Sequence, residues 1–296
     1  MIGARDIFFN PVAGKELRTR MRGWRAAVIL FAYIAILGVI AIAFLWQQAS
    51  PTSGQATPVW TGLFETLSAF QLLLILFVTP VTVAAAISGE RQCQTWDLLR
   101  VSRLSSFSIV YGKLLAAISF NLLLLLASLP LFSLVFLFGG ISPTDVIHVY
   151  IVFIATILLL SSAGLLVSAL TERVQTSMIT AASISFLISA GIALFAFYIQ
   201  NVGVGKALTS GTISGPSLTP AVEFDPVIAL LSALPLAGGG EVLGNNLAMV
   251  HHAFGVGPTM PLWGVFAILA VVFTIGFALL AMISIRPPSR LWSVGR

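Results

Sequence analysis

The sequence predicts an all-α membrane protein with several transmembrane helices. Charged residues make up only 8% of the 296 residues, hydrophobic residues make up 58%, and the mean hydropathy is +1.04. A soluble domain carries roughly 25% charged residues, so this composition excludes a soluble globular protein. The apolar runs are continuous and about 20 residues long, whereas the strands of an outer-membrane barrel alternate over roughly ten residues. The spans are therefore expected to be helices.

Six apolar segments are long enough to cross a hydrocarbon core of about 30 Å at about 1.5 Å per residue. None of them contains Asp, Glu, Lys or Arg. The predicted spans are Ala26–Trp46, Thr66–Ser88, Leu114–Phe138, Val149–Leu170, Met178–Tyr198 and Leu262–Ile285. Residues 1–296 are expected to form one transmembrane domain built on these spans.

The basic residues predict the orientation of the chain. Fourteen of the fifteen lysines and arginines lie in segments that the six-span topology places in the cytoplasm, and Lys206 is the exception. Short loops rich in Lys and Arg resist translocation and stay inside. Both termini are therefore expected in the cytoplasm, with the chain in the inner or plasma membrane of the cell. Anionic lipid and topology explain the net charge of +5 better than nucleic acid does, because the basic residues flank apolar spans.

Residues 1–25 predict an amphipathic elbow helix that lies along the membrane surface. At 100° per residue, its apolar and basic side chains fall on two separate stripes. The residues expected at the membrane interface are Lys15, Arg18, Arg22, Trp24 and Arg25. Such a helix either only anchors the chain or also contacts a cytoplasmic partner, and the sequence leaves both interpretations open.

Residues 199–261, between the fifth and sixth spans, are rich in Gly, Pro and Ser. The apolar run Pro226–Ala237 within them is too short to cross a bilayer, and runs of this length are more often re-entrant or interfacial. We expect an external cap that dips towards the membrane. The neighbouring residues His251 and His252 lack a nearby cysteine or acidic cluster, so no metal site is predicted.

The loop after the second span predicts a short amphipathic helix. Cys93, Trp96 and Leu99 recur at three-residue spacing. A solvated connector does not need Trp96, Leu98 and Leu99 on its surface. Apolar anchors of this kind dock into the groove of a partner, with flanking charges that set the orientation. The alternative is a surface helix that lies flat on the lipid headgroups.

A family pattern appears in the same loop. Its residues are Glu90-Arg91, Thr95, Asp97-Leu98-Leu99 and Ile109–Lys113, preceded near the N-terminus by Asn10-Pro11-Val12 and Lys15–Arg18. This pattern resembles the ABC-2 type permeases, the membrane subunits of a class of ATP-binding-cassette exporters. The predicted topology is also similar to that family. Gln94 stands where the family usually has Gly, Ser102-Arg103 stands where Thr-Pro is common, and the segment before the sixth span is longer than usual.

The resemblance implies a coupling helix at about residues 89–104 that binds in a cleft of a separate cytoplasmic ATPase. The residues expected to contact that ATPase are Glu90, Arg91, Thr95, Trp96, Asp97, Leu98, Leu99, Arg100 and Arg103, with Glu172 and Arg173 in a second contact. The resemblance also implies a second permease subunit, either identical or homologous. A lipid-like or amphipathic substrate is favoured, because the predicted path has no charge to bind a charged one.

Several chemistries lack the residues that they need. No Gly-x4-Gly-Lys-Ser/Thr motif occurs, so the chain is not expected to be an enzyme, and ATP and Mg would bind to the partner ATPase. Charge-free spans disfavour a channel or an ion-coupled carrier. Gln71 and Asn121, the most polar side chains in the spans, either form interhelical hydrogen bonds or line a pathway. The alternative function is a non-transporting scaffold or assembly factor that works through its external loop.

Overall fold

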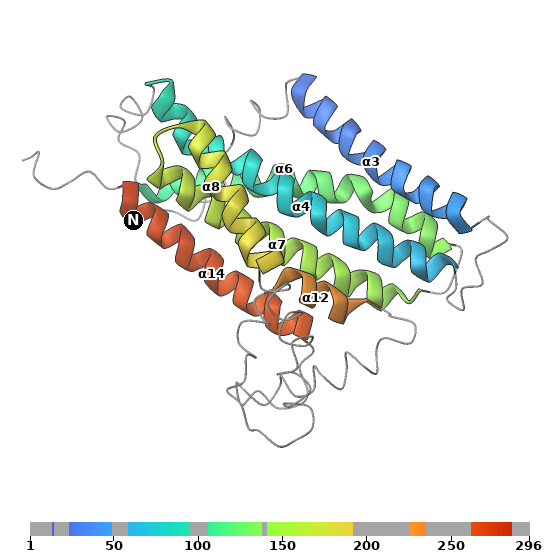
Figure 1. The fold of residues 1–296 in the computed structure, drawn as a ribbon. Coiled ribbons are helices and arrows are strands. Elements are labelled where there is room, and N and C mark those ends of the chain that lie inside the picture. The colour runs from blue at the N-terminus through green and yellow to red at the C-terminus, as the bar shows by residue number, and fades with distance from the viewer. Residues whose placement is uncertain are drawn as a thin grey trace, which may run out of the picture.

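The computed structural model describes residues 14, 24–48, 59–94, 106–137, 141–191, 225–234 and 262–285. The elements are α3 (Trp24–Gln48), α4 (Val59–Gln92), α6 (Ser106–Leu137), α7 (Pro143–Leu170), α8 (Val174–Phe186), the π-helical turn η1 (Leu187–Gly191), α12 (Pro226–Ala233) and α14 (Leu262–Ile285). No strand occurs within these ranges, which agrees with the predicted all-α class (Figure 1).

Five of the helices are long and apolar enough to cross a membrane: α3, α4, α6, α7 and α14. The chain is therefore a multi-pass membrane protein. The fifth predicted span, Met178–Tyr198, corresponds to α8 and η1, whose apolar part from Val174 to Ser189 is shorter than a full span. Residues 192–198 lie outside the described residues, as do most of the predicted elbow helix and of the predicted external cap.

The observed helices differ from the predicted spans mainly at their ends. α14 has the predicted bounds, whereas α4 begins seven residues before Thr66 and ends four residues after Ser88. α6 begins at Ser106, eight residues before the predicted start at Leu114. These extensions carry polar and charged residues, which a hydropathy criterion treats as the end of a span even when the backbone remains helical.

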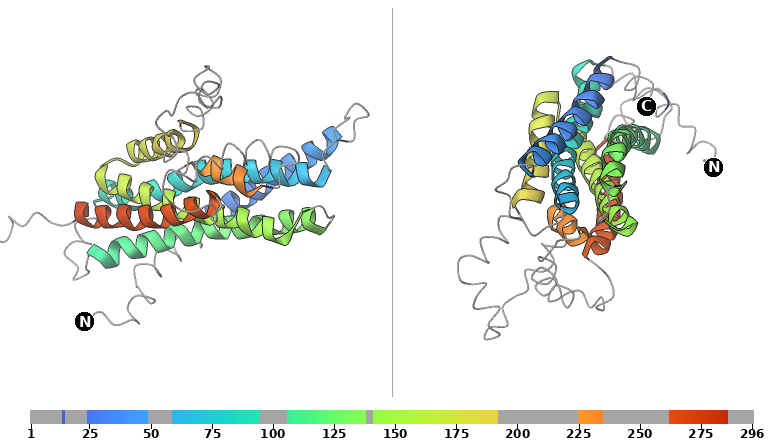
Figure 2. Two further views of the ribbon diagram at one scale, coloured as in Figure 1. Left: turned by 90° about the horizontal axis from the view of Figure 1, so that it is seen from below. Right: turned by 90° about the vertical axis from the view of Figure 1, so that its right-hand side faces the viewer.

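α7 lies in the centre of the bundle. It packs against α4, α6, α8, α12 and α14, while α3 lies at one edge (Figures 1 and 2). In the most apolar stretch of α7, 72% of the residues are buried, whereas in the most apolar stretch of α3 only 11% are buried. Gly164 of α7 permits a close approach to α4, because a Cβ there would lie only 3.3 Å from the Cβ of Val83. Small residues therefore let the two central helices pack closely.

Capping interactions fix the start of α7. Ser142 is the N-cap, and its hydroxyl accepts a hydrogen bond from the Thr144 backbone N–H at 3.4 Å. In return, the Asp145 carboxylate accepts from the Ser142 N–H at 3.2 Å, which completes a capping box. Pro143 at the first helical position has no N–H to lose there. The helix that organises the bundle thus begins at a point set by local sequence.

Candidate functional site

The described start of the first segment that was predicted to contact an ATPase, residues 89–94, lies beside the second such segment. The last turn of α4 and the first turn of α8 meet where the Val174 N–H donates a hydrogen bond to Gln92 Oε1 at 3.3 Å. A Cβ on Gly89 would lie 3.9 Å from a methyl group of Val174. The structure therefore brings Glu90 and Arg91 next to the turn that holds Glu172 and Arg173, although about 80 residues separate the two segments in the sequence.

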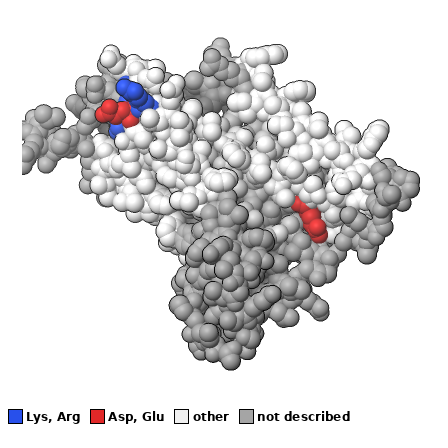
Figure 3. Space-filling view, viewed as in Figure 1, with Lys and Arg blue, Asp and Glu red and all other residues white. Residues whose placement is uncertain are grey.

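We call this region the Glu90 end of the bundle: the last turns of α4 and α7 and the first turns of α6 and α8. Glu172 and Arg173 are exposed there, and Glu90 and Arg91 are half-buried. On the face shown in Figure 3, the basic side chains of the described residues are confined to one small region that also carries acidic atoms. This end therefore presents both signs of charge on a small area.

A buried lysine holds the Glu90 end together. Lys113 of α6 has no exposed surface, and its Nζ lies 2.8 Å from Glu90 Oε1. The same ammonium donates a hydrogen bond to the Ala86 carbonyl of α4 at 2.7 Å. Because a buried charge is costly unless it is paired and hydrogen-bonded, these contacts explain why a lysine is tolerated inside the bundle. They also connect the end of α4 to α6.

Serine hydroxyls connect α4 to α7 and α8 at the same end. Ser168 Oγ accepts hydrogen bonds from the Ile87 N–H at 2.9 Å and the Ser88 N–H at 3.0 Å. Ser177 Oγ of α8 donates to the Ala84 carbonyl at 2.8 Å. Both hydroxyls are fully buried. Together with the Glu90–Lys113 pair, they join four helices through polar contacts at one level of the bundle.

α4 continues further than the predicted boundary between span and coupling helix. Glu90, Arg91 and Gln92 belong to its last turn, and the chain turns at Cys93 and Gln94. Gln94 has φ of 57°, in the left-handed region where a glycine meets no steric penalty. The other predicted coupling residues lie outside the described residues: Thr95, Trp96, Asp97, Leu98, Leu99, Arg100 and Arg103.

The predicted membrane-interface residues are only partly described. Trp24 is the first residue of α3 and is 84% exposed, and Arg25 belongs to the same helix. Lys15, Arg18 and Arg22 lie outside the described residues. The prediction that these side chains lie at the membrane surface therefore stays a prediction.

Gln71 and Asn121, the two polar residues of the spans, are both buried. Asn121 of α6 connects its helix to α4, since its amide donates to Thr82 Oγ1 at 3.3 Å and its oxygen accepts from Thr79 Oγ1 at 3.3 Å. These contacts favour the interhelical hydrogen-bond interpretation for Asn121. Neither residue lines the groove that is described next.

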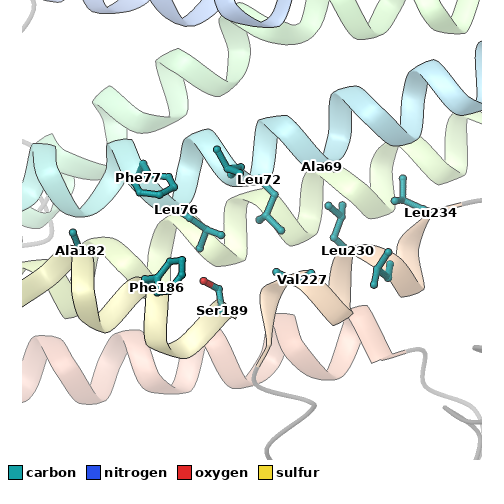
Figure 4. Close-up of a pocket in the computed structure, with 12 residues that line it drawn as sticks. Ala69, Leu72, Leu76, Phe77, Ala182, Phe186, Ser189, Val227, Leu230 and Leu234 are labelled. Carbon is teal, nitrogen blue, oxygen red and sulfur yellow. The ribbon is translucent and has the colours of Figure 1, made fainter. Parts of the chain in front are cut away.

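An apolar groove of about 440 Å³ lies between α4, α8 with η1, and α12 (Figure 4). Its lining residues come from the middle of α4 and from one face of each of the other elements: Ala69, Leu72, Leu73, Leu76, Phe77, Ala182, Phe186, Ser189, Val227, Leu230, Leu231 and Leu234. Val227 lies towards Ser189, and Leu234 lies at the Ala69 end of the groove. The sequence did not predict this groove, because its three walls come from distant segments.

The sequence also gave no sign that Asp225 would be buried. Asp225 is the N-cap of α12, and its Oδ1 accepts a hydrogen bond from the Val227 N–H at 2.8 Å. Its side chain is fully buried, and Oδ2 has no hydrogen-bond partner among the described residues. Burial raises the pKa of the Asp225 carboxyl to about 7, against the effect of the backbone hydrogen bonds that lower it.

The described residues contain no group of three or more His, Cys, Asp or Glu side chains that could hold a metal ion. His251 and His252 lie outside the described residues. A comparison of the chain with protein-family models found no match, and a comparison with curated proteins found none either.

Proposed function

We propose that this chain is the membrane subunit of an ATP-binding-cassette exporter of the ABC-2 type. A separate cytoplasmic ATPase binds this chain at the Glu90 end. ATP and Mg bind to that ATPase and not to this chain. The N- and C-termini lie on the same cytoplasmic side, and the chain forms the translocation pathway together with a second permease subunit. The substrate is lipid-like or amphipathic.

The observation that carries this proposal is that two charged turns, far apart in the sequence, lie side by side. The last turn of α4 and the turn before α8 form one surface at one end of the bundle, with Glu172 and Arg173 exposed on it. Because the two turns adjoin, one docking partner can contact α4 and α8 at the same time. The backbone at Gln94 gives independent support, because it adopts a conformation that favours glycine at the position where the resembled family usually has Gly.

The polar contacts at the Glu90 end provide a way for movement of a bound partner to be transmitted to the helices. The Glu90–Lys113 pair couples α4 to α6, and the two serine hydroxyls couple α4 to α7 and α8. A partner that changes shape on binding nucleotide therefore moves the ends of four helices together. It shifts the bundle between two states to the extent that it binds one of them more tightly.

The proposal is tested by purifying the full chain from its native membrane in mild detergent. We expect an ATPase with a nucleotide-binding motif to co-purify with it. The double variant Glu172→Lys and Arg173→Glu should reduce the amount of that ATPase several-fold, and Trp96→Ala with Asp97→Arg should do the same. Arg290→Glu is the matched control, because it reverses a charge on the same predicted side of the membrane at a residue that is not among the predicted coupling residues.

The proposal fails if no ATPase accompanies the wild-type chain. It also fails if both sets of variants retain the ATPase at the wild-type level and leave its rate of ATP hydrolysis unchanged. Deletion of residues 205–255 separates the exporter from a scaffold, because a scaffold that works through its external segment would lose its external partner but keep any bound ATPase.

A further inference from the structure

The groove between α4, α8 and α12 lies at the depth of the hydrocarbon core. α4 is 34 residues long, which corresponds to about 51 Å at 1.5 Å per residue. The hydrocarbon core is only about 30 Å thick, so the middle of α4 lies within it. The groove residues of α4 run from Ala69 to Phe77 and occupy this middle part.

The groove is continuous with the surface that the bundle presents to lipid. Leu73, Phe77 and Phe186 line it and are also exposed at 46%, 53% and 58%. A molecule in the groove can therefore enter sideways from the bilayer. Among the described residues, the side chains at the entrance already belong to the exposed apolar surface.

The chemistry of the lining excludes a polar occupant. Eleven of the twelve lining residues are apolar, and Ser189 is the exception. The Ser189 hydroxyl already donates a hydrogen bond to the Ser185 carbonyl at 2.8 Å. A charged or strongly polar group placed there would lose its hydration without a compensating partner.

The dimensions favour a flexible chain over a protein helix. The volume of about 440 Å³ lies in the range of roughly 300–1,000 Å³ that is typical of small-molecule sites. A helix with its side chains is about 10 Å across, but α12 contacts both α4 and η1, so the elements that surround the groove touch one another around it. The groove therefore admits a hydrocarbon chain more readily than a helix of a second copy.

We propose that this groove binds one acyl chain of a bilayer phospholipid. The chain lies along α4 between Ala69 and Phe77, with α12 as its second wall. This site does not depend on the proposed exporter function, because it needs only the bundle and the surrounding membrane. Because the surrounding lipid is as apolar as the lining, preference for the groove rests on close van der Waals packing of the chain against α4, α8 and α12 and not on removal of apolar surface from water.

The test is photolabelling of the purified full chain in phosphatidylcholine vesicles. A fraction of the phosphatidylcholine carries a diazirine in the middle of one acyl chain, and labelled peptides are mapped by mass spectrometry. We expect the label to concentrate on peptides from α4, α8 and α12 that line the groove. Ala69→Trp places a large ring at the groove and should reduce this labelling several-fold.

Ala32→Trp is the matched control. Ala32 is also an exposed alanine of a membrane-length helix, but it lies on α3, away from the groove. This variant should leave the groove labelling unchanged. If Ala69→Trp does not fold, Leu231→Trp fills the same groove from the α12 side and serves as the alternative variant.

Two outcomes would overturn the site. The first is uniform labelling of all exposed helices that neither filling variant changes, which would mean that lipid only surrounds the protein. The second is efficient cross-linking of two chains through Leu231→Cys in a Cys93→Ser background, because a second copy would then cover the groove. Cys93 is the only cysteine of the chain, so that background has no other thiol.

Discussion

Two carboxylates lie within the packed helices in opposite surroundings: Glu90 is half-buried at the Glu90 end, and Asp225 is fully buried at the start of α12. At the Glu90 end, Glu90 lies 2.8 Å from the Lys113 ammonium, which also donates to a backbone carbonyl. At the start of α12, one oxygen of Asp225 caps its helix, and the other has no partner among the described residues. Both sites lie next to apolar packing, but within the described part of the chain only the first supplies an opposite charge.

The difference teaches what each carboxylate can contribute. A paired carboxylate in a buried position fixes the geometry of the elements that carry it, and the loss of either partner leaves a buried charge. An acid without an opposite charge is held only if it is protonated or if the environment tolerates the cost of its ionisation. The Glu90 end is therefore expected to depend on its ion pair, whereas the α12 site is expected to respond to pH.

The largest expected effect comes from removal of the cation at the Glu90 end. Lys113→Met leaves the Glu90 carboxylate half-buried and without its ammonium partner, which should lower the free energy of unfolding by about 3 kcal/mol, the lower end of the range for buried pairs, because Glu90 keeps 25% of its side chain exposed. Thermal unfolding in detergent micelles measures this loss. Arg173→Met removes an exposed cation at the same end and should change stability little.

The double variant Glu90→Gln with Lys113→Met decides between a lost ion pair and a packing defect. It removes both charges, so most of the lost stability should return. If the double variant is as unstable as Lys113→Met alone, the ion pair does not hold this end together, and the comparison of the two carboxylates breaks down.

The next effect is a pH dependence at Asp225. The folded pKa of about 7 is above the ordinary value of 3.8, so the folded state binds more protons than the unfolded state in this interval. Stability is therefore expected to fall as pH rises from about 4 to about 7, by roughly 2–3 kcal/mol between pH 5 and pH 8. Thermal unfolding at the two pH values measures the difference.

Asp225→Asn tests the origin of that pH dependence. Asparagine keeps the oxygen that caps α12 but does not titrate, so the variant should lose this part of the pH dependence and gain stability at pH 8. An unchanged difference between pH 5 and pH 8 in the variant would assign the pH dependence to another group.

The smallest expected effect concerns a single hydroxyl. Ser168→Ala removes the acceptor that joins α7 to two backbone N–H groups of α4, and it should cost about 1 kcal/mol. Ser232→Ala is the matched control on α12, because that hydroxyl donates to Ala229 of its own helix at 2.7 Å. If Ser232→Ala lowers the free energy of unfolding more than Ser168→Ala does, the hydroxyl bonds between helices are not what stabilises the Glu90 end. Both losses are read from thermal unfolding.

The sequence predicted the membrane-length helices because hydropathy is a local property. The predicted bounds of α14 agree with the structure, and α3, α4, α6 and α7 contain the predicted cores of their spans. α6 begins eight residues before the predicted span, in a stretch that includes Lys113 and was treated as a loop. A lysine marks the end of a span only if it faces water, and Lys113 instead finds Glu90 on another helix.

The candidate site was also predicted only in part, because it depends on contacts between segments that are far apart in the sequence. The sequence singled out Glu90, Arg91, Glu172 and Arg173 as partner-facing residues but gave no sign that the two pairs adjoin. It also treated Asp225 as part of an external segment, although the structure buries it completely. A signal for Lys113 existed in its position just before a long apolar run, but the partner that makes burial possible is more than 20 residues away.

The sequence by itself determined that this chain is helical and crosses a membrane several times, because composition and run length suffice for that conclusion. Only the tertiary structure decided which helices are central, which charges meet and where an apolar groove opens. These features depend on contacts between residues that are far apart in the chain. Hydropathy does not distinguish α7 from α3, since both are strongly apolar, and only packing buries one and exposes the other.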